Sequence, residues 1–458
     1  MFKYKVLAVI VIVVYFLQPF LFSNGGIGAD SLSYFGIAVD LPNPETNLFP
    51  LGYPVLLRLM YEITQDWFWA SRILSTLFVV VILGFSYFKK FYFRETVLLF
   101  TGKTCLFVFL QAMSEGPFIL LLYFLFYFLH QMFLDKNKSY QNAISASVIL
   151  ICMFSVRYSG VYIYVSILFF SLLMFFKLKR ASYFKSYLLF VFLSGLGIAS
   201  YLFFNYLNFG SFTGENLRGP AMESLPIYII RSVLGVVNAV DPFIGIKPSS
   251  LSFASMAFQL LVFLVDIVIF IYLLKFFKKA KDDPSYYFHI MLWCMAAIYA
   301  VALLVSGWYQ QIEEMNVRMM AAANVCLFFS FLILYFKNVT SDKWIWRVCC
   351  FFFVFLTAYN LKDTDNFLKN KKMVEPQMSK FKNRKYLYND ERQIETITTY
   401  HILFTNKSFQ YKHTNKQIGS LKENIIGTLN PKIKWLMNDT IKDKSKVLYT
   451  SEIKFKRD

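Results

Sequence analysis

The most regular feature of the sequence is a series of apolar runs separated by short polar segments. A helix needs about 20 apolar residues to cross the hydrocarbon core of a bilayer. Eleven runs approach that length, and we expect each to form a membrane-spanning helix. They cover residues 6–22, 67–88, 96–112, 117–133, 143–156, 161–176, 187–206, 253–276, 286–306, 321–336 and 344–361.

The composition agrees with this pattern. Hydrophobic residues make up 57% of the 458 residues and charged residues only 16%, whereas a soluble domain is about a quarter charged. The first run follows Lys3 and Lys5, as the apolar part of a signal peptide would, but residues 23–26 do not form a small-x-small cleavage site. The sequence therefore predicts an all-α integral membrane protein whose first run is a retained anchor.

The basic residues indicate the orientation of these helices. Lys and Arg gather in every second gap between the runs, which the positive-inside tendency assigns to the cytoplasm. The long segments 23–66 and 207–252 then become outer loops, and an odd number of spans places the C-terminus outside. This distribution of the +19 net charge argues against nucleic acid as a partner. The basic gaps lie at residues 3–5, 89–94, 136–138, 177–185, 275–281 and 337–347.

The last part of the chain changes character after residue 361. Residues 1–361 form the expected transmembrane domain, whereas residues 362–458 are polar and basic. Two stretches of this segment, 394–404 and 425–437, are apolar enough to support a small core. We expect a small outer, periplasmic C-terminal domain, with a disordered tail as the alternative.

Cysteine and histidine give no indication of a metal site. All six cysteines lie within apolar runs, where they resemble small buried hydrophobes. None of the four histidines lies near another residue that commonly binds metals. A divalent cation bound by carboxylates stays open, although no ligand set is evident in the sequence.

The first predicted outer loop contains three candidate site residues. Asp30 follows the first span closely and could act as a general base or hold a cation. The alternative is that Asp30 is the N-cap of a helix over 31–39 that also carries Tyr34. Further on, prolines at 50 and 54 precede a short amphipathic helix that would place Arg58 near anionic lipid headgroups.

Two further candidates lie at the boundaries of spans. Glu115 is at or just inside the membrane boundary, where an ionisable residue is costly and indicates function. The alternative is that it belongs to the first turn of a helix. Arg157 lies on the predicted outer side, against the positive-inside tendency, so we expect a phosphate or an acidic side chain as its partner.

Two more arginines belong to predicted outer segments. Arg218 follows a glycine-rich stretch, 209–220, whose exposed backbone amides would suit phosphate recognition. The alternative is a flexible connector. Arg318 forms an outer charged cluster with Glu313 and Glu314.

The order of these features resembles the GT-C superfamily of polytopic glycosyltransferases. The chain is most similar to the bacterial family 39-like enzymes, which include relatives of protein O-mannosyltransferases and of the lipid A aminoarabinose transferase. The resembling motifs together span the first three quarters of the chain. They are Asp30 with Tyr34, residues 50–54, Ser114-Glu115, Arg157-Tyr158-Ser159-Gly160, residues 210–218 and Asn316-Val317-Arg318.

This resemblance implies a sugar donor linked to a polyprenyl phosphate and transfer to a glycan, lipid or protein acceptor on the outer face. It implies that Asp30 is the base and that Arg157, Arg218 and Arg318 hold the lipid phosphate. Many relatives have an acidic pair in the first loop, whereas Ser31 follows Asp30 here, so Glu115 or Asp40 becomes the candidate second carboxylate. The family further suggests the inner membrane of a bacterium.

Three other hypotheses stay open at this stage. A flippase or transporter of lipid-linked sugars would also need arginines for the phosphate, but in a cavity open to both faces. An outer-face oligosaccharide polymerase or ligase would use outer arginines in a similar way. A purely structural membrane protein would leave the clustering of the charged residues without a reason.

Overall fold

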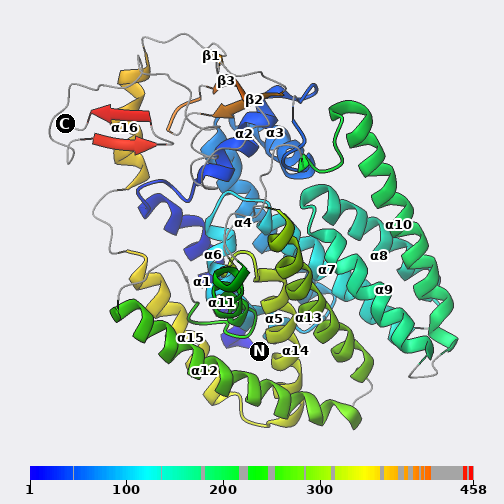
Figure 1. Ribbon diagram of the computed structural model, residues 1–458. Coiled ribbons are helices and arrows are strands. Elements are labelled where there is room, and N and C mark those ends of the chain that lie inside the picture. The colour runs from blue at the N-terminus through cyan, green and yellow to red at the C-terminus, as the bar shows by residue number, and fades with distance from the viewer. Residues whose placement is uncertain are drawn as a thin grey trace.

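The computed structural model is an elongated bundle of helices with small sheets at one end (Figure 1). The structure describes residues 1–44, 46–135, 137–176, 181–215, 225–245, 253–282, 285–310, 315–361, 366–379, 386–389, 396–401, 404–406, 408–413, 447–450 and 453–456.

Within this part of the chain, eight helices are long and apolar enough to cross a bilayer. Two further helices, α9 (Gly160–Phe176) and α15 (Lys343–Tyr359), have 17 residues each. All ten coincide with predicted runs, while the total of eleven spans stays a prediction. The eight are α1 with its 3-10 extension η1 (Phe2–Leu17, Gln18–Leu21), α4 (Trp67–Phe88), α7 (Glu115–Leu134), α8 (Ser139–Val156), α10 (Ala181–Phe209), α12 (Phe253–Lys278), α13 (Tyr286–Tyr309) and α14 (Ala321–Asn338).

The third predicted run does not form one continuous helix. It consists of α5 (Phe93–Leu99) and α6 (Lys103–Leu110), of 7 and 8 residues. The carbonyls and amides exposed by the break find partners elsewhere: Tyr15 donates to the Phe100 carbonyl at 2.5 Å, and the Lys103 amide donates to the Pro242 carbonyl at 2.7 Å. The break is thereby stabilised inside the protein, where an irregular backbone is tolerated.

Part of the second predicted outer loop is packed into the bundle. Helix α11 (Leu225–Val236) leads into the 3-10 turn η3 (Val237–Ala239). Tyr228 of α11 donates to the Leu304 carbonyl of α13 at 2.6 Å, and Asn324 of α14 donates to two carbonyls of η3 at 3.2 and 3.3 Å. The sequence did not indicate this insertion, because a helix of 12 residues is too short to be recognised as a span.

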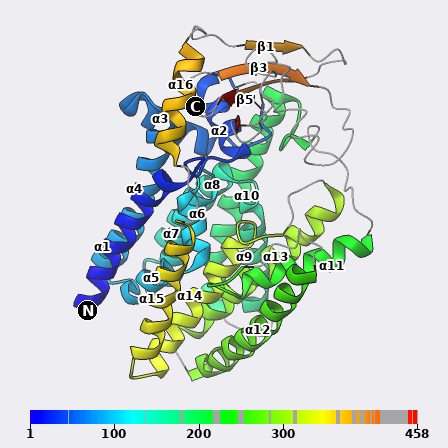
Figure 2. The same ribbon diagram turned by 90° about the vertical axis from the view of Figure 1, so that its left-hand side faces the viewer.

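The N-terminus lies at the end of the bundle away from the sheets (Figure 2), and the basic gaps 3–5 and 337–347 meet there. Here Lys3 pairs with Asp342 at 2.7 Å, and the Lys5 ammonium donates to the Tyr87 hydroxyl at 2.8 Å. Lys337 donates to Ser285 at 2.9 Å. Gaps that are far apart in the sequence therefore meet, as the alternation of basic gaps predicts.

The opposite end contains α2 (Ala29–Asp40), α3 (Gly52–Thr64) and the described part of the C-terminal segment. That segment begins with α16 (Phe367–Ser379), and its strand β2 packs against α2. The sequence analysis assigned no strands here, and the apolar stretch 425–437 lies outside the described residues. The strands are β1 (Tyr386–Asn389), β2 (Thr396–His401) and β3 (Ser408–His413), in the order β1-β3-β2, and the antiparallel pair β4 (Val447–Thr450) and β5 (Ile453–Lys456).

The C-terminal segment is fastened to the first loop by specific contacts. Lys371 pairs with Asp66, the N-cap of α4, at 2.6 Å. The Asn370 side chain donates to the Ser23 carbonyl at 2.8 Å, and the ring of Phe367 stacks on Phe68 with centroids 3.8 Å apart. These contacts hold both ends of the loop that carries α2.

Candidate functional site

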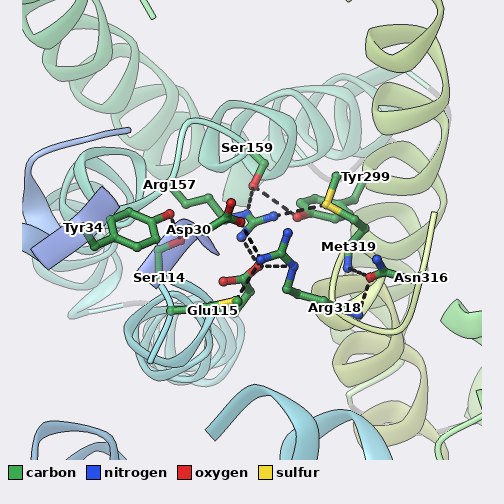
Figure 3. A network of polar contacts seen from close by, with 11 residues as sticks. Asp30, Tyr34, Ser114, Glu115, Arg157, Ser159, Tyr299, Asn316, Arg318 and Met319 are labelled. Carbon is green, nitrogen blue, oxygen red and sulfur yellow. Dashed lines mark hydrogen bonds and ion pairs between the residues drawn. The ribbon is translucent and has the colours of Figure 1, made fainter. Parts of the chain in front are cut away.

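Four charged side chains from distant parts of the sequence meet beside α2 (Figure 3). Asp30 comes from the first turn of α2 and Glu115 from the first turn of α7. Arg157 follows α8 directly, and Arg318 belongs to the turn before α14. We call these four residues the charge cluster.

Glu115 lies at the centre of the charge cluster. Its Oε1 contacts Nη1 of Arg157 and lies 3.3 Å from Nε of Arg318. The same Arg318 reaches Asp30 through Nη1, 2.7 Å from Oδ2. Two guanidinium groups are thus balanced by two carboxylates, and the cluster has no net charge.

The two carboxylates differ in their access to solvent. The Glu115 side chain is only 4% exposed, whereas that of Asp30 is 27% exposed. Burial lowers the pKa of Arg157 and Arg318, but the carboxylates more than offset this, and the pKa of both arginines lies above the ordinary value. Both arginines therefore stay charged, and Asp30 is the carboxylate that an incoming molecule can reach.

The start of α2 explains why Asp30 faces Arg318. Gly28 precedes the helix, and its amide donates to the Ser31 hydroxyl at 3.0 Å. Ser31 and Gly28 thus form the capping interaction, and the interpretation of Asp30 as the N-cap is wrong. The carboxylate of Asp30 remains available for the ion pair.

A tight connection between the first loop and the turn before α7 sets the position of Glu115. The Ala112 amide donates to the Gly26 carbonyl at 2.9 Å, and the hydroxyls of Tyr34 and Ser114 are 2.8 Å apart. Glu115 then opens α7, where the positive end of the helix dipole favours a carboxylate. Glu115 is therefore both a first-turn residue of α7 and a partner in ion pairs, so the two interpretations of this residue are compatible.

Polar contacts also fix both arginines. Nε of Arg157 donates to the Ser159 hydroxyl at 3.1 Å, and the Tyr299 hydroxyl donates to the same oxygen at 3.1 Å. Asn316 Oδ1 accepts the backbone amides of Arg318 and Met319 at 2.9 and 3.1 Å, which shapes the turn that presents Arg318.

Sequence reasoning found part of this arrangement. It expected a phosphate or an acidic side chain beside Arg157, and the structure places Glu115 there. It did not single out Tyr299, because nothing distinguishes a tyrosine within an apolar span from a lipid-facing one. The sulfur contacts of Met113 with Arg318 and of Met319 with Arg157 were also not foreseen.

One predicted site residue, Arg58, lies apart from the charge cluster. Arg58 lies on α3, where its side chain is 37% exposed and pairs with Glu62 at 2.7 Å. Arg218 lies outside the described residues, as do Glu313 and Glu314.

The glycine-rich stretch before Arg218 already contains an anion from the protein itself. The carboxylate of Glu215 accepts the backbone amides of Phe212 and Thr213 at 3.0 and 2.7 Å. Ser211 and Asn47 exchange hydrogen bonds of 2.8 and 2.9 Å. The amides of Phe212 and Thr213 are thus already occupied by Glu215. The contacts between Ser211 and Asn47 connect the two predicted outer loops.

Among the described residues, no group of three or more His, Cys, Asp and Glu side chains is arranged to hold a metal ion. No model of a known protein family matches the chain, and no curated protein matches it either. Its function must therefore be argued from the charge cluster.

Proposed function

We propose that the chain is a membrane glycosyltransferase that moves a sugar from a polyprenyl-phosphate donor to an acceptor on the outer face of the membrane. The observation that carries this proposal is the charge cluster: two fixed arginines beside one accessible and one enclosed carboxylate. The resemblance of the motif order to GT-C enzymes supports the same conclusion.

Arg157 and Arg318 are suited to hold the phosphate of the donor. Guanidinium groups bind phosphate oxygens through paired, charge-assisted hydrogen bonds. Their side chains are 16% and 12% exposed, so a phosphate would meet them largely out of water. In such surroundings, fixed donors stabilise the charge that develops on a leaving group much better than water does.

Asp30 is the proposed general base. Its Oδ2 lies 2.7 Å from Nη1 of Arg318. A phosphate that binds this guanidinium would replace Asp30 as its partner and leave the carboxylate free to accept a proton from the acceptor. Glu115 is too enclosed for that task. In this proposal it is a positioning residue that holds both arginines in place.

The proposed reaction is a displacement at the anomeric carbon of the donor sugar. The acceptor oxygen or nitrogen forms a bond to the anomeric carbon while the bond from that carbon to the phosphate oxygen breaks. The acceptor proton passes to Asp30, and polyprenyl phosphate leaves as an anion held by the arginines. A single activating carboxylate favours direct displacement with inversion of the anomeric centre, by analogy with glycosidases.

The bundle suits a donor with a lipid tail. The eight long apolar helices make the chain compatible with a multi-pass membrane protein. The basic end would face the cytoplasm by the positive-inside tendency, so the charge cluster lies toward the outer side of a bacterial inner membrane. The acceptor is a glycan, a lipid or a protein on that side.

The test is binding and turnover of the purified protein with a panel of polyprenyl-phosphate sugars and a mixture of acceptors. We expect wild type to release polyprenyl phosphate. Asp30→Asn should bind the donor, but its rate of release should fall by a factor of about 100 or more, as the loss of a general base implies. Asp135→Asn is the matched control and should keep full turnover. Asp135 lies at the basic end of the bundle, where its carboxylate accepts the Asn137 amide. Full turnover by Asp30→Asn would refute the assigned base.

The same experiment separates the rival functions. Transfer of bound lipid across vesicles without release of polyprenyl phosphate would favour a flippase. Release from pyrophosphate-linked oligosaccharides alone would favour a polymerase or ligase.

A further inference from the structure

A second group of charged side chains lies in the interior of the bundle, away from the charge cluster. Asp266 is near the middle of α12, and Asp241 follows η3. Lys103 begins α6, directly after the break in the third predicted run. Ionisable residues within a membrane-spanning bundle are costly, so each of them calls for a partner and a purpose.

The two irregular backbone segments of the bundle meet at this place. Asp241 Oδ1 accepts the amides of Phe243 and Ile244 at 2.6 and 3.0 Å. The Lys103 ammonium donates to the carbonyls of Ile244 and Gly245 at 3.2 and 3.4 Å. One oxygen of Asp241 and the Lys103 ammonium thus satisfy two amides and two carbonyls within residues 243–245.

The remaining oxygens of the two carboxyl groups are buried. Asp241 is 4% exposed and Asp266 is 2% exposed. The Oδ2 of Asp241 and both oxygens of Asp266 lack a hydrogen-bond donor among the described residues. The two carboxyl groups lie within hydrogen-bonding reach of each other.

Two carboxylates in this position cannot both be ionised. At hydrogen-bonding separation, two negative charges repel strongly in a medium of low dielectric constant, and a shared proton removes the conflict.

We propose that Asp241 and Asp266 form a binding site for one exchangeable proton inside the bundle, with Lys103 as the counter-ion. With one shared proton, the carboxyl pair carries a single negative charge, which the Lys103 ammonium balances. Two neutral amides of the described residues lie near this centre: Asn238 of η3 is beside Gly245, and Asn324 of α14 donates to η3. Tyr359 of α15 interacts with Lys103.

The shared proton joins two parts of the bundle. Asp241 belongs to the inserted segment. Asp266 belongs to α12, many of whose apolar side chains are exposed, for example those of Leu261, Val268 and Ile271. The proton therefore fastens a loosely packed helix to the core at the middle of its length. This inference does not depend on the proposed glycosyl transfer, because it can be measured without donor or acceptor.

The test is infrared difference spectroscopy of the full chain in lipid nanodiscs without substrate. A protonated carboxyl has a carbonyl stretch that shifts when H₂O is replaced by D₂O. We expect one such band in wild type at neutral pH, lost in both Asp266→Asn and Asp241→Asn. Asp342→Asn is the control: Asp342 is ionised, since hydrogen bonds from Lys3 and Tyr4 lower its pKa, and the band should persist.

The opposite results are equally clear. A neutral-pH spectrum without a band that depends on Asp241 and Asp266 would overturn the proposal. Thermal stability that depends on Na⁺ or K⁺, and not on pH, would also overturn it and would indicate a metal cation instead. Should Asp266→Asn fail to assemble, a pH titration of the wild-type band decides: the proposal requires a single proton to leave as the pH rises.

Discussion

The charge cluster and the carboxyl pair, Asp241 with Asp266, each bring two acidic side chains together, but the acids are neutralised differently. In the charge cluster, Arg157 and Arg318 provide permanent charges within 3.3 Å of carboxylate oxygens. At the carboxyl pair, one oxygen of Asp241 accepts amides, and Lys103 donates to backbone carbonyls.

This difference separates two uses of buried carboxylates. The guanidinium groups of Arg157 and Arg318 stay charged, which suits the binding of an anionic phosphate. A pair of carboxyls without such donors must take up a proton, and its charge can change with conditions. The same residue types therefore predict anion binding in one region and proton binding in the other.

The largest effect on stability should come from Glu115→Gln. The change leaves two buried guanidiniums without their shared carboxylate, and loss of one partner of a buried ion pair costs about 3 to 5 kcal/mol. Glu62→Gln is the matched control, because Glu62 pairs with Arg58 on an exposed face, and should cost less than about 1 kcal/mol. Equal losses in thermal or denaturant unfolding would show that the charge cluster is not an interdependent buried network.

A pH effect of nearly the same size should occur where the C-terminal segment docks against α2. His401 is packed against Phe35 and Trp67, and burial lowers its pKa to about 4. The unfolded segment binds the proton more readily, so docking is strongest above pH 6.5 and weakens as the pH falls toward 4, by up to about 3 kcal/mol.

Limited proteolysis of the C-terminal segment against pH measures this effect. His401→Phe removes the titrating group, so its cleavage should vary much less between pH 6.5 and 4. A wild-type profile that is flat over this window would contradict the assignment to His401.

A smaller loss is expected from Gly26→Ala, which disturbs the connection that positions Glu115. Gly26 has a φ of +70°, and a Cβ there would lie 2.1 Å from the Leu110 carbonyl oxygen. We expect a destabilisation of about 2 kcal/mol or more, from the left-handed backbone and the clash. Gly84→Ala in α4 meets nothing within 4 Å and should be neutral or stabilising. Indistinguishable melting temperatures for the two variants would argue against a rigid connection at Gly26.

The smallest effect should follow Asp266→Asn, although it makes the same carboxyl-to-amide change as Glu115→Gln. The amide can donate the hydrogen bond that the shared proton provides, so the stability should change by less than about 1 kcal/mol at neutral pH. A loss as large as that of Glu115→Gln would mean that Asp266 is ionised, and the contrast between the two regions would disappear.

The spanning helices followed from the sequence because long apolar runs have few alternatives in a bilayer. The run over residues 96–112 was the exception. Gly102 and Lys103 interrupt it, but such an interruption does not tell whether a helix continues or breaks. Here the break is compensated by Pro242, a contact with a segment some 140 residues away that no local pattern shows.

The charge cluster was partly accessible to sequence reasoning for a similar reason. Asp30, Glu115, Arg157 and Arg318 are ionisable residues close to the ends of apolar runs, so their positions in the sequence mark them as candidates. Their pairing depends on how four segments pack. The glycine-rich stretch shows the opposite case: from the sequence its amides suited a phosphate, with a flexible connector as the alternative, but the carboxylate of Glu215 occupies two of them.

The central claim is that Asp30 reacts and Glu115 positions the arginines. The most direct measurement compares donor affinity and release of polyprenyl phosphate for Asp30→Asn and Glu115→Gln with wild type, on the folded fraction of each protein. The account predicts that Asp30→Asn binds the donor and loses release, whereas Glu115→Gln binds it at least tenfold more weakly. Wild-type release by Asp30→Asn, or the same defect in both variants, would contradict it.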